Sequence, residues 1–307
     1  MACLSFLVVA LNSGGQTASW GSPLLIGLLV VVGVSGAAFW VIEKYARMPI
    51  APTRLFVHWQ WRNVPLMLIN RTLLFFHNFA LIFYVPIFLQ VIGLDTLKAS
   101  ALIIPFLFMA SVSSTFANEL TSKYGYIRLA MVCGLVVLPI GMGLMSSLRE
   151  SSSVSRIVGY SLVSGFGFGA GTQLMLVMAQ VGLPADELST VTALVGAAPT
   201  LGGVLGVAVM GSVINTAFQA NLDSSPVLAN STIPLNANDV VTTLSRFSQH
   251  DPARDAVVSA YVSSWQRGCY LLVGVAGLQI LLCCLVRQVE FDSHGKRDAL
   301  MNEVRVQ

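Results

Sequence analysis

The sequence is poor in charge. Only 10% of its 307 residues are Asp, Glu, Lys or Arg, whereas soluble domains carry about 25%. Too few charges are present to cover a 32.8 kDa globule with a water-exposed surface. Hydrophobic residues make up 55% of the chain, and the mean hydropathy is +0.76. This composition excludes an ordinary soluble protein and predicts that most of the chain lies in a lipid bilayer.

The sequence also lacks the motifs of several function classes. The net charge of +3 gives no basic stripe for a phosphate backbone, so nucleic acid is not an expected partner. The chain has no HExxH, P-loop or GxSxG motif and no Cys/His set with metal-ligand spacing. Gly165–Gly171 superficially resembles a dinucleotide loop, but it lies inside an apolar run with no preceding strand. We therefore predict no catalytic residue, no metal site, no cofactor and no enzymatic activity.

Long uncharged or nearly uncharged apolar runs are what the sequence has in abundance. The runs cover residues 24–42, 66–92, 99–118, 127–148, 157–181, 189–218 and 268–286. Each has about 19 residues or more, which is enough to cross a hydrocarbon core of roughly 30 Å. Inside lipid each segment must satisfy its own backbone hydrogen bonds, so the runs are predicted to be helices. The expected fold class is an all-α integral membrane protein with about seven transmembrane helices.

Two local features modify this prediction. The runs contain Pro86, Pro105, Pro139 and Pro199, and prolines inside helices predict local kinks. Before the last run, residues 253–267 favour a short interfacial helix, with Tyr261 and Trp265 at the lipid headgroups.

The loops predict an orientation. Segments 43–63, 119–128, 182–188 and the tail after 286 share one side and carry ten basic residues. The opposite side carries six, three of them in the long loop 219–267, where they count little. The positive-inside rule places the first side, with the C-terminus, in the cytoplasm. The outer loop contains a glycosylation tripeptide at Asn230.

Few polar residues interrupt the runs, and these are the candidate site residues. Arg71 lies near the cytoplasmic start of its run and is expected to snorkel to the interface. His77 and Asn78 lie deeper, so they should face the bundle interior, either as a hydrogen-bonded packing pair or as part of a substrate cavity. Further cavity candidates are Tyr84, Gln90 and Gln173. No Asp or Glu lies within a run, so any coupling carboxylate is outside this chain, or His77 substitutes for it.

Small residues recur at the spacing of close helix contacts. Gly165 and Gly169 form one GxxxG pair, and Gly202 and Gly206, with Gly203 beside them, form another. Such residues let helix backbones approach each other in lipid. We expect these glycines to serve helix packing, and the smooth contacts would also allow one bundle to rock against another.

Several strings occur in an order and spacing that resemble one transporter family. Residues 12–15 with Trp20 look like the loop between two extra central helices, and residues 49–56 look like a "P-x-x-P-x-R-L-F" linker. Residues 84–90 are similar to a "Y-L-P-x-Y-F-Q" helix end. Gly202, Gly203 and Gly206 are similar to a "T-L-G-G-x-x-G-V-A" helix. Leu120, Lys123, Gly125 and Arg128 are similar to the loop signature G-x-L-x-D-R-x-G-R-x-x. Asn118 stands for its first Gly, Ser122 for its Asp and Tyr126 for an Arg, which places the charge-relay role of that loop in doubt.

Over nearly its whole length, the chain resembles the C-terminal half of the 14-spanner drug:proton antiporters of the major facilitator superfamily, in their fungal efflux-pump branch. The resemblance implies a C-terminal six-helix bundle (64–288, with outer loop 219–267). Residues 1–63 would hold part of the central helix pair, its first helix truncated, and a cytoplasmic loop, and residues 289–307 a cytoplasmic tail.

The implied function is efflux of small amphipathic organic compounds or drugs by proton antiport and alternating access. The implied partners are the bilayer, a small-molecule substrate and a missing N-terminal half, and the implied location is the plasma membrane. Three alternatives remain open: a truncated fragment without transport, a membrane-embedded enzyme and a receptor-like helical protein.

Overall fold

The computed structural model consists of helices joined by short turns. It describes residues 5–7, 9–10, 21–45, 52, 55–56, 61–224, 237, 239–244, 247 and 251–287. The main helices are α2 (Pro23–Tyr45), α4 (Asn63–Val91), α5 (Thr96–Ala101), α6 (Ile104–Tyr124), α7 (Ile127–Ser146), α8 (Val154–Gln180), α9 (Ala185–Asp223), α10 (Val240–Leu244) and α11 (Pro252–Cys284). No strand occurs among the described residues. The all-α prediction is therefore confirmed.

Seven helical segments within the described part of the chain are long and apolar enough to cross a membrane, as predicted. The third segment differs from the prediction, because it consists of α5 followed directly by α6. Pro105 lies in the first turn of α6, so it begins a helix and does not kink one. A proline fits there because first-turn N–H groups have no partner within the helix. Pro86, Pro139 and Pro199 lie inside their helices as expected.

The expected interfacial helix at residues 253–267 is wrong. These residues form the first half of α11, which runs without a break over 33 residues. Asp251 caps its start, accepting a 2.9 Å hydrogen bond from the N–H of Ala253. Tyr261 and Trp265 are fully buried against neighbouring helices and are not free to reach headgroups. The ring of Trp265 stacks on Phe88, and its Nε1 donates to the Met145 carbonyl at 3.1 Å.

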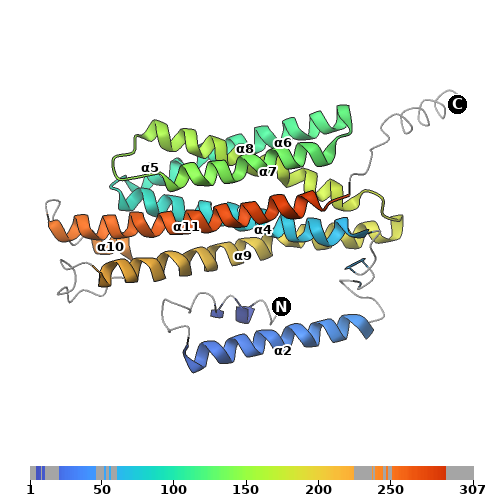
Figure 1. Ribbon diagram of the computed structural model, residues 1–307, viewed down its shortest axis with the longest axis horizontal. Helices are drawn as coiled ribbons and strands as arrows, with labels where there is room; N and C mark the ends of the chain where they lie inside the picture. Colours follow the sequence, from blue (N-terminus) through green and yellow to red (C-terminus); the bar gives the residue numbers. More distant parts are fainter. Residues whose placement is uncertain are drawn as a thin grey trace, which may run out of the picture.

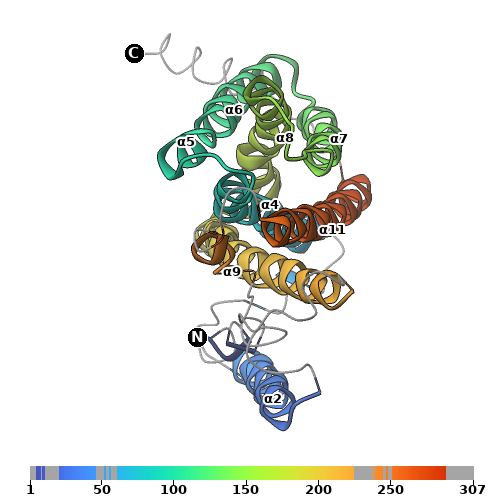
Figure 2. The ribbon, with the colours of Figure 1, turned by 90° about the vertical axis from the view of Figure 1, so that its left-hand side faces the viewer.

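The helices form two groups around α4 (Figures 1 and 2). On one side α6 and α7 both pack on α8, and on the other α4 packs on α9 and α11. Helix α11 also contacts α7 and closes the bundle. Helix α2 lies apart from this bundle in both views, and of its residues only Leu25 and Glu43 are buried. Its apolar surface therefore fits a lipid-facing position outside the bundle.

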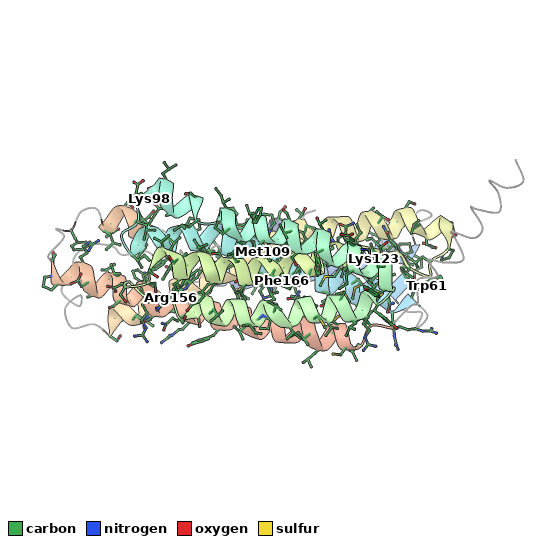
Figure 3. The ribbon with its side chains drawn as sticks, turned by 90° about the horizontal axis from the view of Figure 1, so that it is seen from above. Trp61, Lys98, Met109, Lys123, Arg156 and Phe166 are labelled. Atoms are coloured by element: carbon green, nitrogen blue, oxygen red, sulfur yellow. The ribbon has the colours of Figure 1, made fainter. Side chains whose placement is uncertain are left out.

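The loop groups predicted from charge lie at opposite ends of the bundle. Lys98 and Arg156 lie near one end and Lys123 near the other (Figure 3). Two turns at the Lys123 end contain a glycine with positive φ, Gly125 at 75° and Gly182 at 80°. Glycine adopts this backbone conformation without the steric cost that other residues incur. The glycosylation tripeptide at Asn230 and the tail 289–307 lie outside the described residues.

Candidate functional site

Polar residues follow one face of α4 at intervals of seven. Asn63, Asn70, His77 and Tyr84 are all buried in this helix. A spacing of seven corresponds to nearly two helical turns, so these four side chains share one face. The sequence analysis selected the last two but missed the period that joins them to Asn63 and Asn70. The seven-residue spacing is the signal that would have found the whole set, which we call the α4 polar stripe.

Asn70 and His77 of the α4 polar stripe contact α11, which runs antiparallel to α4, and Asn63 contacts Arg287 just beyond the end of α11. Asn63 exchanges two hydrogen bonds with the backbone of Arg287, at 3.0 and 2.9 Å. Gln279 Nε2 donates to the Asn70 carbonyl at 2.9 Å. His77 Nε2 lies 2.8 Å from the Leu272 carbonyl oxygen. Along the two helices these contacts advance together, which fixes the register of α4 against α11.

His77 is fully buried, and both of its ring nitrogens face carbonyl oxygens. Nδ1 lies 2.7 Å from the Leu73 carbonyl oxygen, one turn earlier in α4, and Nε2 faces Leu272 of α11. A neutral imidazole carries one N–H and can donate to only one of these oxygens, whereas an imidazolium can donate to both. The number of hydrogen bonds that His77 donates, and with it the bond from α4 to α11, therefore depends on the protonation state and tautomer of the ring.

Arg71 does not snorkel to the interface as expected. Its side chain turns toward α8, where Nη1 donates to the Thr172 carbonyl. The guanidinium also lies 5.4 Å from the centre of the Phe75 ring, within the range of a cation–π contact. Arg71 is only 8% exposed. A cation held in this position belongs to the interior of the bundle.

Near Arg71 the bundle has unused hydrogen-bonding capacity. Within the described residues, four buried polar atoms on α4 and α11 have no hydrogen-bond partner. They are Asn70 Oδ1, Arg71 Nε, Asn78 Oδ1 and Gln279 Oε1. Unpaired polar atoms are costly in a protein interior and usually bind water or a ligand. We call these four residues the α4–α11 polar patch, and their spare atoms suit contact with a polar group of a bound molecule.

The five predicted cavity residues do not converge on one site. Asn78 belongs to the polar patch, and His77 lies in the helix contact described above. Tyr84 donates its hydroxyl to the Val207 carbonyl of α9 at 3.1 Å. Gln90 lies in the last turn of α4, where it donates to the Pro86 carbonyl and accepts from Thr96. Gln173 is exposed on α8, directly after Thr172.

The predicted packing glycines lie where helix backbones cross. A Cβ atom on Gly165 would lie 2.3 Å from the Phe106 carbonyl oxygen of α6, and one on Gly169 would lie 2.0 Å from that of Ala110. Likewise, a Cβ atom on Gly202 would lie 2.0 Å from the Thr72 carbonyl oxygen of α4, and one on Gly206 would lie 2.3 Å from that of Phe76. Gly203 instead faces the Phe79 ring, at 2.7 Å. These glycines set the α6–α8 and α4–α9 contacts.

The loop-signature residues surround the turn between α6 and α7. Lys123 pairs with Glu119 one turn earlier, at 3.5 Å, and both side chains are well exposed. Gly125 ends α6, and Leu120 is exposed in the last turns of that helix. Arg128 donates to the Cys284 carbonyl at 2.7 Å, which joins α7 to the end of α11. The Lys123–Glu119 pair lies within α6, and the Arg128 contact joins the start of α7 to the end of α11. Among the described residues, no group of three or more His, Cys, Asp or Glu side chains could hold a metal ion.

Comparison with known proteins identifies the class of the bundle. No family model matches the chain. It is 27% identical over 278 residues to the "MFS efflux transporter inpD" of Emericella nidulans and 29% identical over 279 residues to the "Efflux pump roqT" of Penicillium rubens, with 90% of this chain covered in each case. It is also 23% identical over 302 residues to "Citrate exporter 1" of Yarrowia lipolytica. The chain therefore resembles transporters of the major facilitator superfamily over about nine-tenths of its length.

These superfamily relatives are transporters, which agrees with the prediction that the chain is not an enzyme. The chain spans about half the length of the curated relatives it matches, at 52%, 50% and 44% of the three. A solved structure of a bacterial homologue of the human lysosomal transporter Spinster is similar, with a TM-score of 0.56 and 12% identity. That similarity covers 93% of this chain and 66% of the solved chain. It supports the same helical fold, and the helices and the transporter relatives together show a multi-pass membrane protein.

Proposed function

We propose that this chain is the C-terminal half of an efflux transporter that moves small amphipathic organic compounds out of the cell by alternating access. The observation that carries the proposal is similarity to efflux transporters along nine-tenths of this chain but only half of theirs. Transporters of this kind bind substrate between two repeats near the middle of the membrane. One six-helix bundle supplies one wall of such a site.

In this proposal the α4–α11 polar patch contributes to the wall. Arg71 supplies a positive charge and the spare donor Nε, and the spare amide oxygens of Asn70, Asn78 and Gln279 supply three acceptors. Charged and polar groups at this depth are costly in lipid, which favours a role for them in transport. A substrate with one polar end and an apolar body suits such a wall, because apolar side chains surround the patch.

We extend the proposal to proton antiport. Acidic side chains of the described spanning helices lie only near helix ends, such as Glu119 in α6 and Asp186 in α9. His77 is the buried titratable group at mid-depth that contacts both α4 and α11. Proton coupling would therefore use a carboxylate from the complementary half, with His77 as the group of this chain that responds to it.

The basic loops support a cytoplasmic C-terminus, and we place the complete transporter in the plasma membrane. At the Lys123 end, the Arg128 guanidinium donates to the Cys284 carbonyl, which holds its positive charge at that face. The cytoplasmic face attracts such charge.

A transport assay in a drug-sensitive yeast strain tests the proposal. The chain would be expressed alone and also joined to the N-terminal six helices of a similar efflux transporter, and retention of a fluorescent amphipathic dye would be measured. We expect dye efflux only from the joined protein, and acceleration by an inward proton gradient. Strong proton-linked efflux by the chain alone would contradict the half-transporter proposal, while an inactive but folded joined protein would favour the non-transporting fragment.

A further inference from the structure

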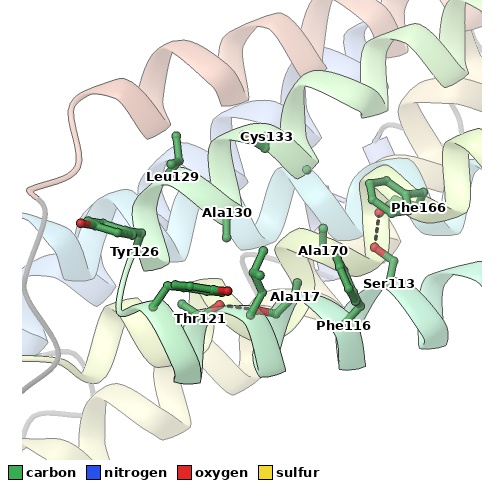
Figure 4. A pocket seen from close by; sticks show the side chains of 13 residues that line it. Ser113, Phe116, Ala117, Thr121, Tyr126, Leu129, Ala130, Cys133, Phe166 and Ala170 are labelled. Carbon is green, nitrogen blue, oxygen red and sulfur yellow. Dashed lines mark hydrogen bonds between the residues drawn. The ribbon is translucent and has the colours of Figure 1, made fainter. Parts of the chain in front are cut away.

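An apolar groove lies outside the polar patch, at the Lys123 end of the bundle. It has a volume of about 370 Å³ and is lined by α6, α7 and α8. Figure 4 shows its walls: Phe116 and Ala117 come from α6, Tyr126 and Ala130 from α7, and Ala170 from α8. Nothing in the proposed transport cycle uses this groove. We propose that it binds an acyl chain of an anionic phospholipid from the cytoplasmic leaflet.

The groove follows from where the small residues are placed. Helix α6 meets α8 most closely at Gly165 and Gly169, and α7 meets α8 where a Cβ on Gly134 would lie 2.4 Å from Cβ of Ala170. Beyond these crossings α6 and α7 continue toward the Lys123 end, and these two helices make little contact with each other. The last turns of α6 and the first turns of α7 therefore enclose a wedge-shaped space that no side chain of the described residues fills.

The dimensions of the groove fit one acyl chain. On α6 its lining extends from Ser113 to Tyr124, which is about 16 Å of helix at 1.5 Å per residue. Half of a roughly 30 Å hydrocarbon core is about 15 Å, the depth of one leaflet. Most residues of the lining are apolar. The hydroxyls of Ser113 and Thr121 are used in hydrogen bonds: Thr121 donates to the Ala117 carbonyl, and Ser113 donates to the Phe166 carbonyl at 2.7 Å. A hydrocarbon chain therefore meets no unpaired hydroxyl at Ser113 or Thr121, and the tyrosine hydroxyls of the lining lie at its open end.

The open end of the groove fits an anionic headgroup. Tyr124 and Tyr126 flank Gly125 and are 66% and 58% exposed, as expected for aromatic residues at a membrane interface. Lys123 precedes Tyr124 at the end of α6 and pairs with Glu119, and Arg128 follows Tyr126 in α7 and donates to the Cys284 carbonyl of α11. These three charged groups leave a net charge of about +1 at the surface of the anionic cytoplasmic leaflet. The exposed Phe116 and Leu129 keep the side of the groove open to lipid.

Photocrosslinking of the full chain in lipid nanodiscs tests this proposal. The nanodiscs would contain phosphatidylcholine with a small fraction of phosphatidylserine that carries a diazirine midway along one acyl chain, and adducts would be mapped by peptide mass spectrometry. We expect adducts to concentrate on residues 113–134. The variant Ala130→Phe/Cys133→Phe fills the groove from α7. Its adduct yield should fall about tenfold, which corresponds to lost contact with roughly two methylene groups.

The matched control is Val136→Phe/Ile140→Phe, which adds two rings to the same helix at exposed positions outside the groove. Its adduct yield should not change. Equal labelling in the two double variants, or adducts spread evenly over the outer face of α7, would show ordinary surrounding lipid and overturn the proposal. Loss of adducts when a complementary half is joined would show that protein covers the groove, and would also overturn it.

The headgroup part has its own test, which does not depend on filling the groove. Lys123 is exposed, so Lys123→Gln leaves the helix contacts in place. We expect this variant to lower the ratio of phosphatidylserine to phosphatidylcholine adducts toward one while groove labelling persists. An unchanged ratio would overturn the choice of an anionic lipid. Neither result depends on dye efflux, so this proposal can fail while the proposed transport function stands.

Discussion

Gly202 in α9 allows a direct test of how the half-bundle is held together. A Cβ atom at this position would lie 2.0 Å from the Thr72 carbonyl oxygen of α4. The two backbones would have to separate by about 1.4 Å to reach the 3.4 Å of ordinary contact. A carbonyl in a helix cannot rotate away as a side chain can, so Gly202→Ala must shift α9 against α4.

The expected cost can be isolated with a control in the same helix. Overpacking of this kind costs about 1–3 kcal/mol, and Gly→Ala by itself favours a helix by up to about 1 kcal/mol. Gly196, six residues earlier in α9, has nothing within 4 Å of its hypothetical Cβ. Both variants share the gain in helix propensity, so their difference in unfolding free energy reports the clash. We expect Gly202→Ala to be less stable than Gly196→Ala by about 1–3 kcal/mol.

Denaturation of the purified protein with sodium dodecyl sulfate in mixed micelles, followed by tryptophan fluorescence, measures this difference. Gly203→Ala supplies an intermediate case, because its Cβ would meet the Phe79 ring at 2.7 Å and a ring can tilt. The expected order of stability is Gly196→Ala, then Gly203→Ala, then Gly202→Ala. If the first and last variants unfold at the same detergent fraction, the close approach of α4 and α9 is not what stabilises the half-bundle.

Three further predictions concern single contacts and orientation. Tyr84→Phe removes the 3.1 Å hydrogen bond to the Val207 carbonyl. It should lower the unfolding free energy by about 0.6 kcal/mol in the same assay, a typical value for a hydrogen bond between membrane helices. The control Tyr270→Phe, at an exposed site, should leave the unfolding free energy unchanged. Trp265→Phe removes the hydrogen bond to the Met145 carbonyl and part of the stacking on Phe88. We expect the unfolding free energy to fall by about 1–3 kcal/mol. The control Trp40→Phe in α2 should not change it. With a membrane-impermeant thiol reagent on intact cells, Arg149→Cys should be labelled and Lys123→Cys protected, and the opposite pattern would reverse the proposed orientation.

The sequence predicts the spanning helices well because hydropathy alone decides them. Where it fails, local signals compete with packing. The first half of α11 carries Arg254, Asp255 and Arg267, which lower its hydropathy, yet Tyr261 and Trp265 bury this half against the bundle. The result is one continuous helix in place of an interfacial helix followed by a span. Tertiary contacts overrode the local pattern there, and no single-sequence signal contains them.

The candidate site was predicted less completely, since burial of a polar residue does not reveal its partner. His77 was rightly placed inside the bundle, but its two partners are main-chain carbonyl groups, which leave no trace in the sequence. Arg71 was expected to snorkel because it lies near a helix end, whereas its inward turn depends on the Thr172 carbonyl of another helix. Gln279, which completes the polar patch, lies in the final apolar run and carries no distinctive local signal.

The period of seven on α4 then distinguishes the two kinds of helix contact in this half. Against α11 and the residue Arg287 beyond its end, the bonds from Asn63, Gln279 and His77 are directional and fix one register. These four bonds, at about 0.6 kcal/mol each, contribute about 2.4 kcal/mol together. Against α9, the contact through Gly202 and Gly206 depends mainly on close backbone approach. A small sliding motion breaks all four of these bonds at once but only shifts the van der Waals contacts with α9. Any rearrangement within the half during transport should therefore move α4 and α11 together and be accommodated at the glycine contacts.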